Sequence, residues 1–179
     1  FGILPIKDRL IYNSPQRGDI IVFRKPGDEQ IDYIKRLIGL PGDTVQLVNG
    51  RLYVNNNLIT RKKTNIGQIT KYDGSTINLI EYEENISNKK SYKIIESSDN
   101  DFFDNTIKFT VPKDNFFFMG DNRDNSKDSR ASEVGFVPKI NLVGKAQIIF
   151  FSHNGSARFY EFWKWQNLIR FSRIGKKIE

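Results

Sequence analysis

The chain has 179 residues, 38% of them hydrophobic and 13% aromatic, which suffices for one domain or for a domain with a small added lobe. It contains no cysteine and one histidine, which excludes thiol catalysis, disulfides and zinc sites built from several Cys and His ligands. The histidine, His153, lies in a Ser-His-Asn-Gly turn, so a Ser-His-Asp triad is not expected.

The formal charge of +7 is concentrated at the C-terminus, where residues 156–179 account for +4 and also contain six aromatic side chains. Bases interleaved with aromatics suit a lipid headgroup layer or a nucleic acid, and they also suit an ordinary segment that packs its rings on the domain. Of these partners we expect a membrane lipid surface and no nucleic acid. No stretch approaches the roughly 18 consecutive apolar residues of a membrane span, so no bilayer crossing is expected within these residues.

The N-terminal third is predicted to consist of strands joined by tight turns. Apolar runs at residues 19–23 and 30–39 are bounded by turns that contain glycine and proline. Residues 44–48 and 51–54 flank Asn49-Gly50, a dipeptide that tolerates the positive φ of a two-residue hairpin turn. This is the strongest local signal for a hairpin in the chain.

The middle of the chain is predicted to form an inserted β lobe. Between residues 60 and 110 the composition shifts toward Asn, Lys, Ser, Asp and Glu, with strands expected at residues 76–82 and 91–95. No internal repeat and no phosphate-binding glycine loop is present.

The lobe is expected to interrupt a β core made of residues 1–59 and 111–155. Strands of this core are predicted at residues 115–119 and 143–151, where apolar residues cluster again. Residues 156–179 are expected to end the core as its basic aromatic segment.

One predicted strand carries a lysine on an apolar face. The two-residue period of residues 31–38 places one set of side chains on one face (Ile31, Tyr33, Lys35, Leu37) and the other set opposite (Asp32, Ile34, Arg36, Ile38). Lys35 is the only charged residue of its face, whereas Arg36 has Asp32 as a neighbour on its own face.

Such a lysine is a candidate general base. Desolvation among apolar groups lowers the pKa of an ammonium. The positive charge of the neighbouring Arg36 is a second candidate cause of a lowered pKa at Lys35. A neutral lysine can take a proton from a serine hydroxyl without any histidine. The alternative is that Lys35 extends its head to solvent at the sheet edge.

A polar loop, residues 120–130, follows the apolar strand that ends at Met119. Its spacing does not fit an EF-hand, because counting from Asp121 places serines where the glycine and the bidentate glutamate are needed, and no metal site is expected. Local Asx turns and an ion pair of Asp128 with Arg130 or Arg123 are expected to make the loop rigid. Ser126 would then meet a lysine amine in a fixed orientation.

Two segments, DYIKRLIGLPGD at residues 32–43 and GDNRDNSKDSR at residues 120–130, resemble the signature boxes of bacterial type I signal peptidases. RGDIIVF at residues 17–23 and GFVP at residues 135–138 extend the similarity in order, apart from the predicted lobe and part of the tail. The resemblance implies a mainly β fold, with a β-sheet core of coiled β-barrel character and a smaller inserted lobe, and it implies no cofactor.

The same resemblance implies a membrane-anchored serine endopeptidase that removes signal peptides from exported preproteins after a small residue. Its catalytic core would lie on the outer face of the cell inner membrane. Lys35 matches the general base of the family, and Ser126 matches the serine that hydrogen-bonds this base. Other matched positions support the site (Asp128, Arg130, Gly120, Asp121, Asn122) or line shallow pockets and pair with the extended substrate backbone (Val22, Asp32, Tyr33, Ile34).

The sequence departs from the family in one respect. The nucleophile of the family is a serine in a Ser-Met-x-Pro box upstream of the segment matched by residues 17–23, and here the only serine before Arg17 is Ser14, without the methionine. Because the chain begins with Phe1, we expect this box, the serine that forms the oxyanion hole and the membrane anchor to lie upstream. This chain alone is then expected to be inactive.

Three alternatives remain at this stage. The first is a homologue that has lost activity, and the second is a related Ser-Lys peptidase such as a self-cleaving repressor, against which the loop at residues 120–130 argues. The third is a non-enzymatic β-rich binding module at a membrane surface. The sequence does not indicate an oligomeric state.

Overall fold

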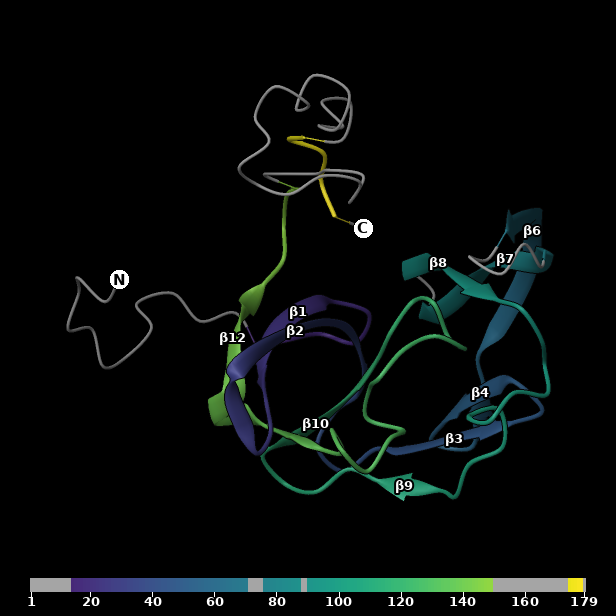
Figure 1. Cartoon of the computed structure of the whole chain (residues 1–179). Helices are drawn as coiled ribbons and strands as arrows, with labels where there is room; N and C mark the ends of the chain where they lie inside the picture. The colour runs from purple at the N-terminus through teal and green to yellow at the C-terminus, as the bar shows by residue number, and fades with distance from the viewer. Residues whose placement is uncertain (1–13, 71–75, 88–89, 150–173, 179) are drawn as a thin grey trace.

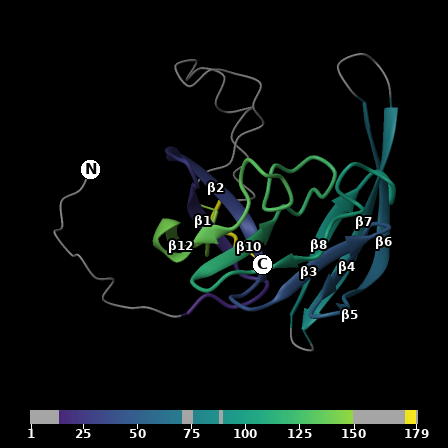
Figure 2. The same cartoon turned by 90° about the horizontal axis from the view of Figure 1, so that it is seen from below.

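A computed structural model describes residues 14–70, 76–87, 90–149 and 174–178, and these residues form a mainly β structure. The strands pair antiparallel in three sheets of five, four and three strands (Figures 1 and 2). The prediction of a mainly β fold is confirmed. Within the described ranges, no helix is long and apolar enough to span a bilayer.

The five-stranded sheet contains the strand that carries the first part of the box at residues 32–43 and the strand that leads into the polar loop. Its order is β11 (Val137–Pro138), β10 (Asn115–Met119), β2 (Asp28–Gly39), β1 (Ile20–Lys25) and β12 (Leu142–Lys145). A single 3₁₀ turn, η1 (Lys139–Asn141), joins β11 to β12. Strand β2 lies between β10 and β1: β1 pairs with it from Asp28 to Arg36, whereas β10 pairs only with its last part, from Arg36 to Gly39.

The four-stranded sheet contains the predicted hairpin. Its order is β5 (Asn57–Leu58), β4 (Arg51–Val54), β3 (Thr44–Val48) and β9 (Phe109–Thr110). Asn49 and Gly50 have φ angles of 48° and 69°, as a type I′ turn requires. The predicted hairpin and the bounds of both its strands are confirmed.

The three-stranded sheet, here called the lobe sheet, consists of β6 (Thr60–Thr70), β7 (Thr76–Ser87) and β8 (Lys90–Glu96). The strands predicted at residues 76–82 and 91–95 are present and longer than expected. Strand β6 was missed because its residues are mostly polar and lack an apolar period. It is a strand because it pairs with β7 along its length. The division of the chain at residues 60 and 110 stays a prediction.

Two apolar clusters lie on opposite faces of β2. Leu37 belongs to the cluster that includes Ile21, Phe23 and Phe118, and Ile38 belongs to the one that includes Val45 and residues of the lobe sheet. This alternation agrees with the predicted faces of β2. It places Lys35 and Arg36, the next residues along the strand, at the margins of the two clusters.

The last predicted strand is shorter than expected. Strand β12 ends at Lys145 because its partner β1 begins at Ile20, whose carbonyl accepts a hydrogen bond from the amide of Ala146. Phe150 and Phe151, His153 and most of the segment at residues 156–179 lie outside the described residues.

Glu96, the last residue of β8, is a buried carboxylate. Its side chain is 1% exposed; one oxygen accepts a hydrogen bond from Arg61, and the other has no hydrogen-bond partner among the described residues. Burial raises the pKa of Glu96 to about 7, although Arg61 acts in the opposite direction.

We predict that Glu96→Gln flattens the pH dependence of the unfolding free energy between pH 4.5 and 7. A carboxyl group whose pKa is higher in the folded state favours folding fully below its usual value of 4.5, and this contribution is lost as the pH rises to about 7. The difference in the pKa of Glu96 between the unfolded state (4.5) and the folded state (about 7) corresponds to about 3 kcal/mol of unfolding free energy. Urea unfolding of both proteins across this pH range measures it, and parallel curves would contradict the prediction.

Candidate active site

The two boxes meet at Lys35 and Ser126. Strand β2 carries Lys35, and the loop after β10 carries Ser126. The two side chains are 2.9 Å apart, with Lys35 Nζ donating to Ser126 Oγ. Lys35 is half-buried and Ser126 is buried. The amine therefore points to the second box, and the alternative of a lysine head extended into solvent does not describe this structure.

The surroundings of Lys35 favour its neutral form. Desolvation by burial lowers the pKa of Lys35, and the Arg130 guanidinium lowers it further, while Asp128 and Asp121 act in the opposite direction. The predicted desolvation is present. The expected contribution of Arg36 is not among the causes of the shift, and Arg130 is the arginine that contributes.

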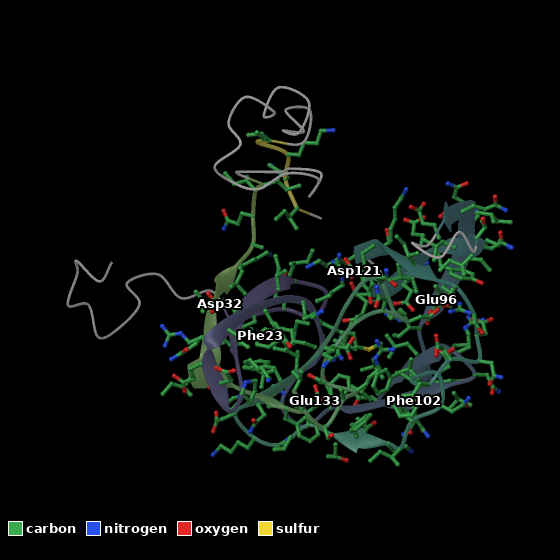
Figure 3. The ribbon with its side chains drawn as sticks, viewed as in Figure 1. Phe23, Asp32, Glu96, Phe102, Asp121 and Glu133 are labelled. Carbon is green, nitrogen blue, oxygen red and sulfur yellow. The ribbon has the colours of Figure 1, made fainter. Side chains whose placement is uncertain are left out.

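Arg36 pairs with Asp121 rather than with Asp32, its predicted neighbour. Its Nε and Nη2 donate to the two carboxylate oxygens of Asp121, both at 2.8 Å, and Nη1 donates to the carbonyl of Gly18 at 2.9 Å. Asp32 is exposed on the outer part of β2, away from Asp121 (Figure 3). The strand period gave the face that Arg36 shares with Asp32, but it does not indicate a partner on another segment, and Asp121 was therefore missed.

Asp128 and Arg130 form the inner support of the loop. Both side chains are fully buried, and Arg130 donates to both oxygens of Asp128, at 2.9 and 2.8 Å. Asp128 also accepts the amide of Gly120 at 2.9 Å. Of the two arginines considered for Asp128, the structure selects Arg130, while Arg123 pairs with Glu84 of the lobe sheet.

Gly120 lies in close contact with Ser126. A Cβ atom added to Gly120 would lie 2.1 Å from Ser126 Oγ, 2.6 Å from Ser126 Cβ and 3.5 Å from Lys35 Nζ. Only glycine leaves room for the Ser126 hydroxyl at this position. The backbone of Gly120 thus forms one wall of the site.

An open pocket of about 290 Å³ adjoins the Lys35 amine. Its lining combines strand residues with polar residues of the loop and one residue near the C-terminus (Ile20, Ile34, Lys35, Arg36, Gly120, Asp121, Asn122, Asn125, Ser126, Ile178). The pocket brings together most of the residues predicted from the two boxes. Among the described residues, no group of acidic, histidine or cysteine side chains is arranged to bind a metal ion.

The four candidates for substrate binding are placed differently. Ile34 lines the pocket and is 53% exposed, and Val22 is its cross-strand neighbour on β1. Tyr33 and Phe23 pack with their rings nearly perpendicular, and the ring centroid of Tyr33 lies 5.6 Å from Lys35 Nζ. Asp32 is exposed and lies outside the pocket lining.

Four pocket residues were not among the predicted site residues, and one of them is Arg36, described above. Ile20 begins β1, Asn125 lies within the loop, and Ile178 reaches the pocket from the C-terminal segment. Asn125 stands directly before Ser126 and was available from the box. Nothing in the sequence near Ile178 indicates its place, because it arrives through contacts with a distant part of the chain.

The comparisons with known proteins agree with the two boxes. The model of the family described as signal peptidase, peptidase S26, matches residues 3–151, and the chain therefore belongs to this family. Curated proteins called signal peptidase I are similar to it: that of Rickettsia akari (strain Hartford) is 44% identical over 159 residues, and that of Rickettsia prowazekii (strain Madrid E) is 43% identical over 152 residues. The predicted resemblance is confirmed.

These alignments cover 85% and 82% of this chain and 58% and 56% of the two relatives. The chain thus spans less than two thirds of their length. A crystal structure of a signal peptidase I from Enterococcus faecalis V583 has 27% sequence identity and a TM-score of 0.43, covering 74% of this chain and 97% of that chain.

Proposed function

We propose that this chain is the catalytic part of a serine endopeptidase that removes signal peptides from exported preproteins, with Lys35 as the general base. The observation that carries the proposal is the Lys35 Nζ to Ser126 Oγ hydrogen bond of 2.9 Å, made in desolvated surroundings beside an open pocket. A base must be neutral and must be oriented toward its substrate proton: desolvation serves the first need, and the contact with Ser126 serves the second.

In the proposed reaction the neutral amine of Lys35 takes the proton of a serine hydroxyl as that oxygen attacks the scissile carbonyl. The resulting ammonium gives the proton to the leaving amine, and a second cycle with water releases the acyl group. Ser126 is buried against Gly120, so its proposed role is to orient the amine rather than to attack. The attacking serine is proposed to belong to a Ser-Met-x-Pro box upstream of Arg17.

The substrate is proposed to bind as an extended strand next to Ile34 and Val22. Ile34 is exposed at the pocket beside Lys35, and an apolar wall close to the base favours small side chains at the cut. The family membership supports a place at the inner membrane, with the catalytic core on its outer face, an anchor upstream and the lipid surface as a further partner.

The test uses the chain extended upstream by a segment with a Ser-Met-x-Pro box. We expect this protein to cut a synthetic signal peptide that has alanine before the scissile bond, and to cut the matched peptide with leucine there at least ten times more slowly. Replacing the box serine by alanine is the control for the nucleophile. An extended protein that is folded but leaves the alanine peptide intact would favour an inactive homologue or a binding module.

Gly120→Ala is predicted to lower the cleavage rate of the extended protein about 100-fold, because the new methyl group displaces Ser126 and through it the Lys35 amine. The matched control is Gly67→Ala in β6, where an added Cβ meets nothing within 4 Å. Initial rates measure the effect at a temperature where thermal unfolding finds both variants folded. Equal rates for the two variants would contradict it.

A further inference from the structure

The edge of the lobe sheet holds the backbone of the Ser126 loop. The amide of Ile95 in β8 donates to the carbonyl of Asp121 at 2.8 Å, and the amide of Arg123 donates back to the carbonyl of Ile95 at 2.9 Å. Ile95 and Asn122 thus form a parallel bridge, which extends the lobe sheet into the loop. Asp121 and Glu96, labelled in Figure 3, mark the two sides of this junction.

A carboxylate fastens the loop to the residues that follow β8. Asp124 Oδ2 accepts the amide of Ser97 at 2.6 Å, its hydroxyl at 2.7 Å and the amide of Ser98 at 3.2 Å. Three donors on one oxygen fix both position and orientation of the loop at Asp124, two residues before Ser126.

The second attachment is an ion pair buried between the loop and the lobe sheet. The side chains of Arg123 and Glu84 are each 1% exposed. Arg123 Nη1 donates to one oxygen of Glu84 at 3.0 Å, Nη2 donates to the other, and Tyr92 Oη also donates to Glu84, at 3.0 Å. Because a buried ion pair often stabilises a fold no better than apolar residues of similar volume, this pair suggests a role in defining geometry.

Further contacts connect both sides of this ion pair to the surroundings of Lys35. The carbonyl of Arg123 accepts Arg130 Nη2 at 2.6 Å, and Arg130 in turn holds Asp128, whose carboxylate binds the amide of Gly120. On the lobe side, the ring of Tyr92 lies 4.1 Å from the guanidinium of Arg36, the residue next to Lys35. The contacts therefore enclose the Lys35–Ser126 pair from two directions.

We propose that Glu84 is a positioning residue, through which the lobe sheet fixes the Ser126 loop against the Lys35 amine. The inference rests on the proposed function, and it assigns the lobe sheet a part in the site although Glu84 does not line the pocket. Its charge partner Arg123 transmits the constraint, and the Asp124 contacts provide a second, separate attachment.

The kinetic test compares Glu84→Gln with Glu83→Gln in the extended protein. Glu83 precedes Glu84 in β7 and accepts a hydrogen bond from Ser91 within the lobe sheet, so its variant is the matched control for loss of a carboxylate. We expect Glu84→Gln to lower kcat 10- to 100-fold with KM within twofold, and Glu83→Gln to leave both unchanged. If both variants are folded and their kcat values are equal, the inference is overturned. Activity of the extended protein without substitutions would still support the proposed function.

A second readout needs no catalysis and uses the chain as it stands. The pH dependence of reductive methylation at Lys35, followed by mass spectrometry, reports the pKa of the amine. We expect Glu84→Gln to admit water and to raise this pKa toward its usual value, so that labelling at neutral pH slows severalfold relative to Glu83→Gln. An unchanged labelling profile would overturn the inference even if the parent proves inactive as a peptidase.

A third variant addresses the case in which Glu84→Gln does not fold because Arg123 is left buried without its partner. Asp124→Asn loosens the second attachment without leaving a buried cation, since the donors to Asp124 are backbone amides and a hydroxyl. We expect it to slow Lys35 labelling in the same direction and to a smaller extent. A folded Asp124→Asn protein with the parent profile would, in that case, contradict the inference.

Discussion

Lys35→Ala in the extended protein is expected to lower kcat/KM for a signal peptide about 10⁴-fold, the upper range for loss of a general base. The amine is held at 2.9 Å from Ser126 Oγ, and among the described residues no other amine makes a hydrogen bond to that hydroxyl. Lys35→Arg is the matched variant, because it keeps a cation that does not deprotonate near neutral pH. We expect it to be as inactive as the alanine variant.

The pH dependence of kcat/KM for the extended protein without substitutions tests whether Lys35 acts as a base in its neutral form. Only the neutral amine accepts a proton, so kcat/KM rises with pH and levels off above the pKa of Lys35. Because burial lowers this pKa, the plateau is expected to begin below the usual lysine value of 10.5. Initial rates across pH measure it. Turnover by Lys35→Ala at the parent rate would contradict the proposed role.

Asp128→Asn is expected to destabilise the protein by about 3–5 kcal/mol, the usual cost of removing one partner of a buried ion pair. Arg130 would remain fully buried beside a neutral amide, and the amide of Gly120 would lose the charge of its acceptor. Urea unfolding measures the change in free energy.

The matched control is Glu133→Gln in the same part of the chain. Glu133 pairs with Lys127 at 3.1 Å, and the two side chains are 62% and 72% exposed (Figure 3). An exposed ion pair contributes about 0–1 kcal/mol, so this variant is expected to unfold near the parent midpoint. Equal destabilisation by both substitutions would mean that burial of the Asp128–Arg130 pair is not what makes it important.

The elements predicted well are those specified by neighbouring residues. The Asn49-Gly50 turn requires positive φ at both positions, and the continuous apolar run Phe116 to Met119 marks β10 directly. The candidate pair Lys35 and Ser126 was also predicted, from the faces of β2 and from the two boxes. Their hydrogen bond joins residues that are 91 positions apart.

The features that were missed depend on which segments meet in space. Strand β6 has no apolar period and is ordered by its pairing with β7. Arg36 has a carboxylate on its own predicted face, yet it binds Asp121, which the loop brings closer. The choice of Glu84 for Arg123 likewise follows from the packing of the lobe sheet on the loop, and Asp128 is paired within the loop by Arg130.

Among the described residues, the contacts of the lobe sheet with the loop come from Glu84 in β7, from Ile95 in β8 and from the residues that follow β8. Thr60 pairs with Asn85 at the end near Glu84, whereas Thr70 pairs with Thr76 at the opposite end of the β6–β7 ribbon. Homologous chains would therefore tolerate insertions and deletions in the outer part of this hairpin, since length changes there leave the inner contacts intact. Sequence drift should be faster near the Thr70–Thr76 pair than around Glu84 and Tyr92.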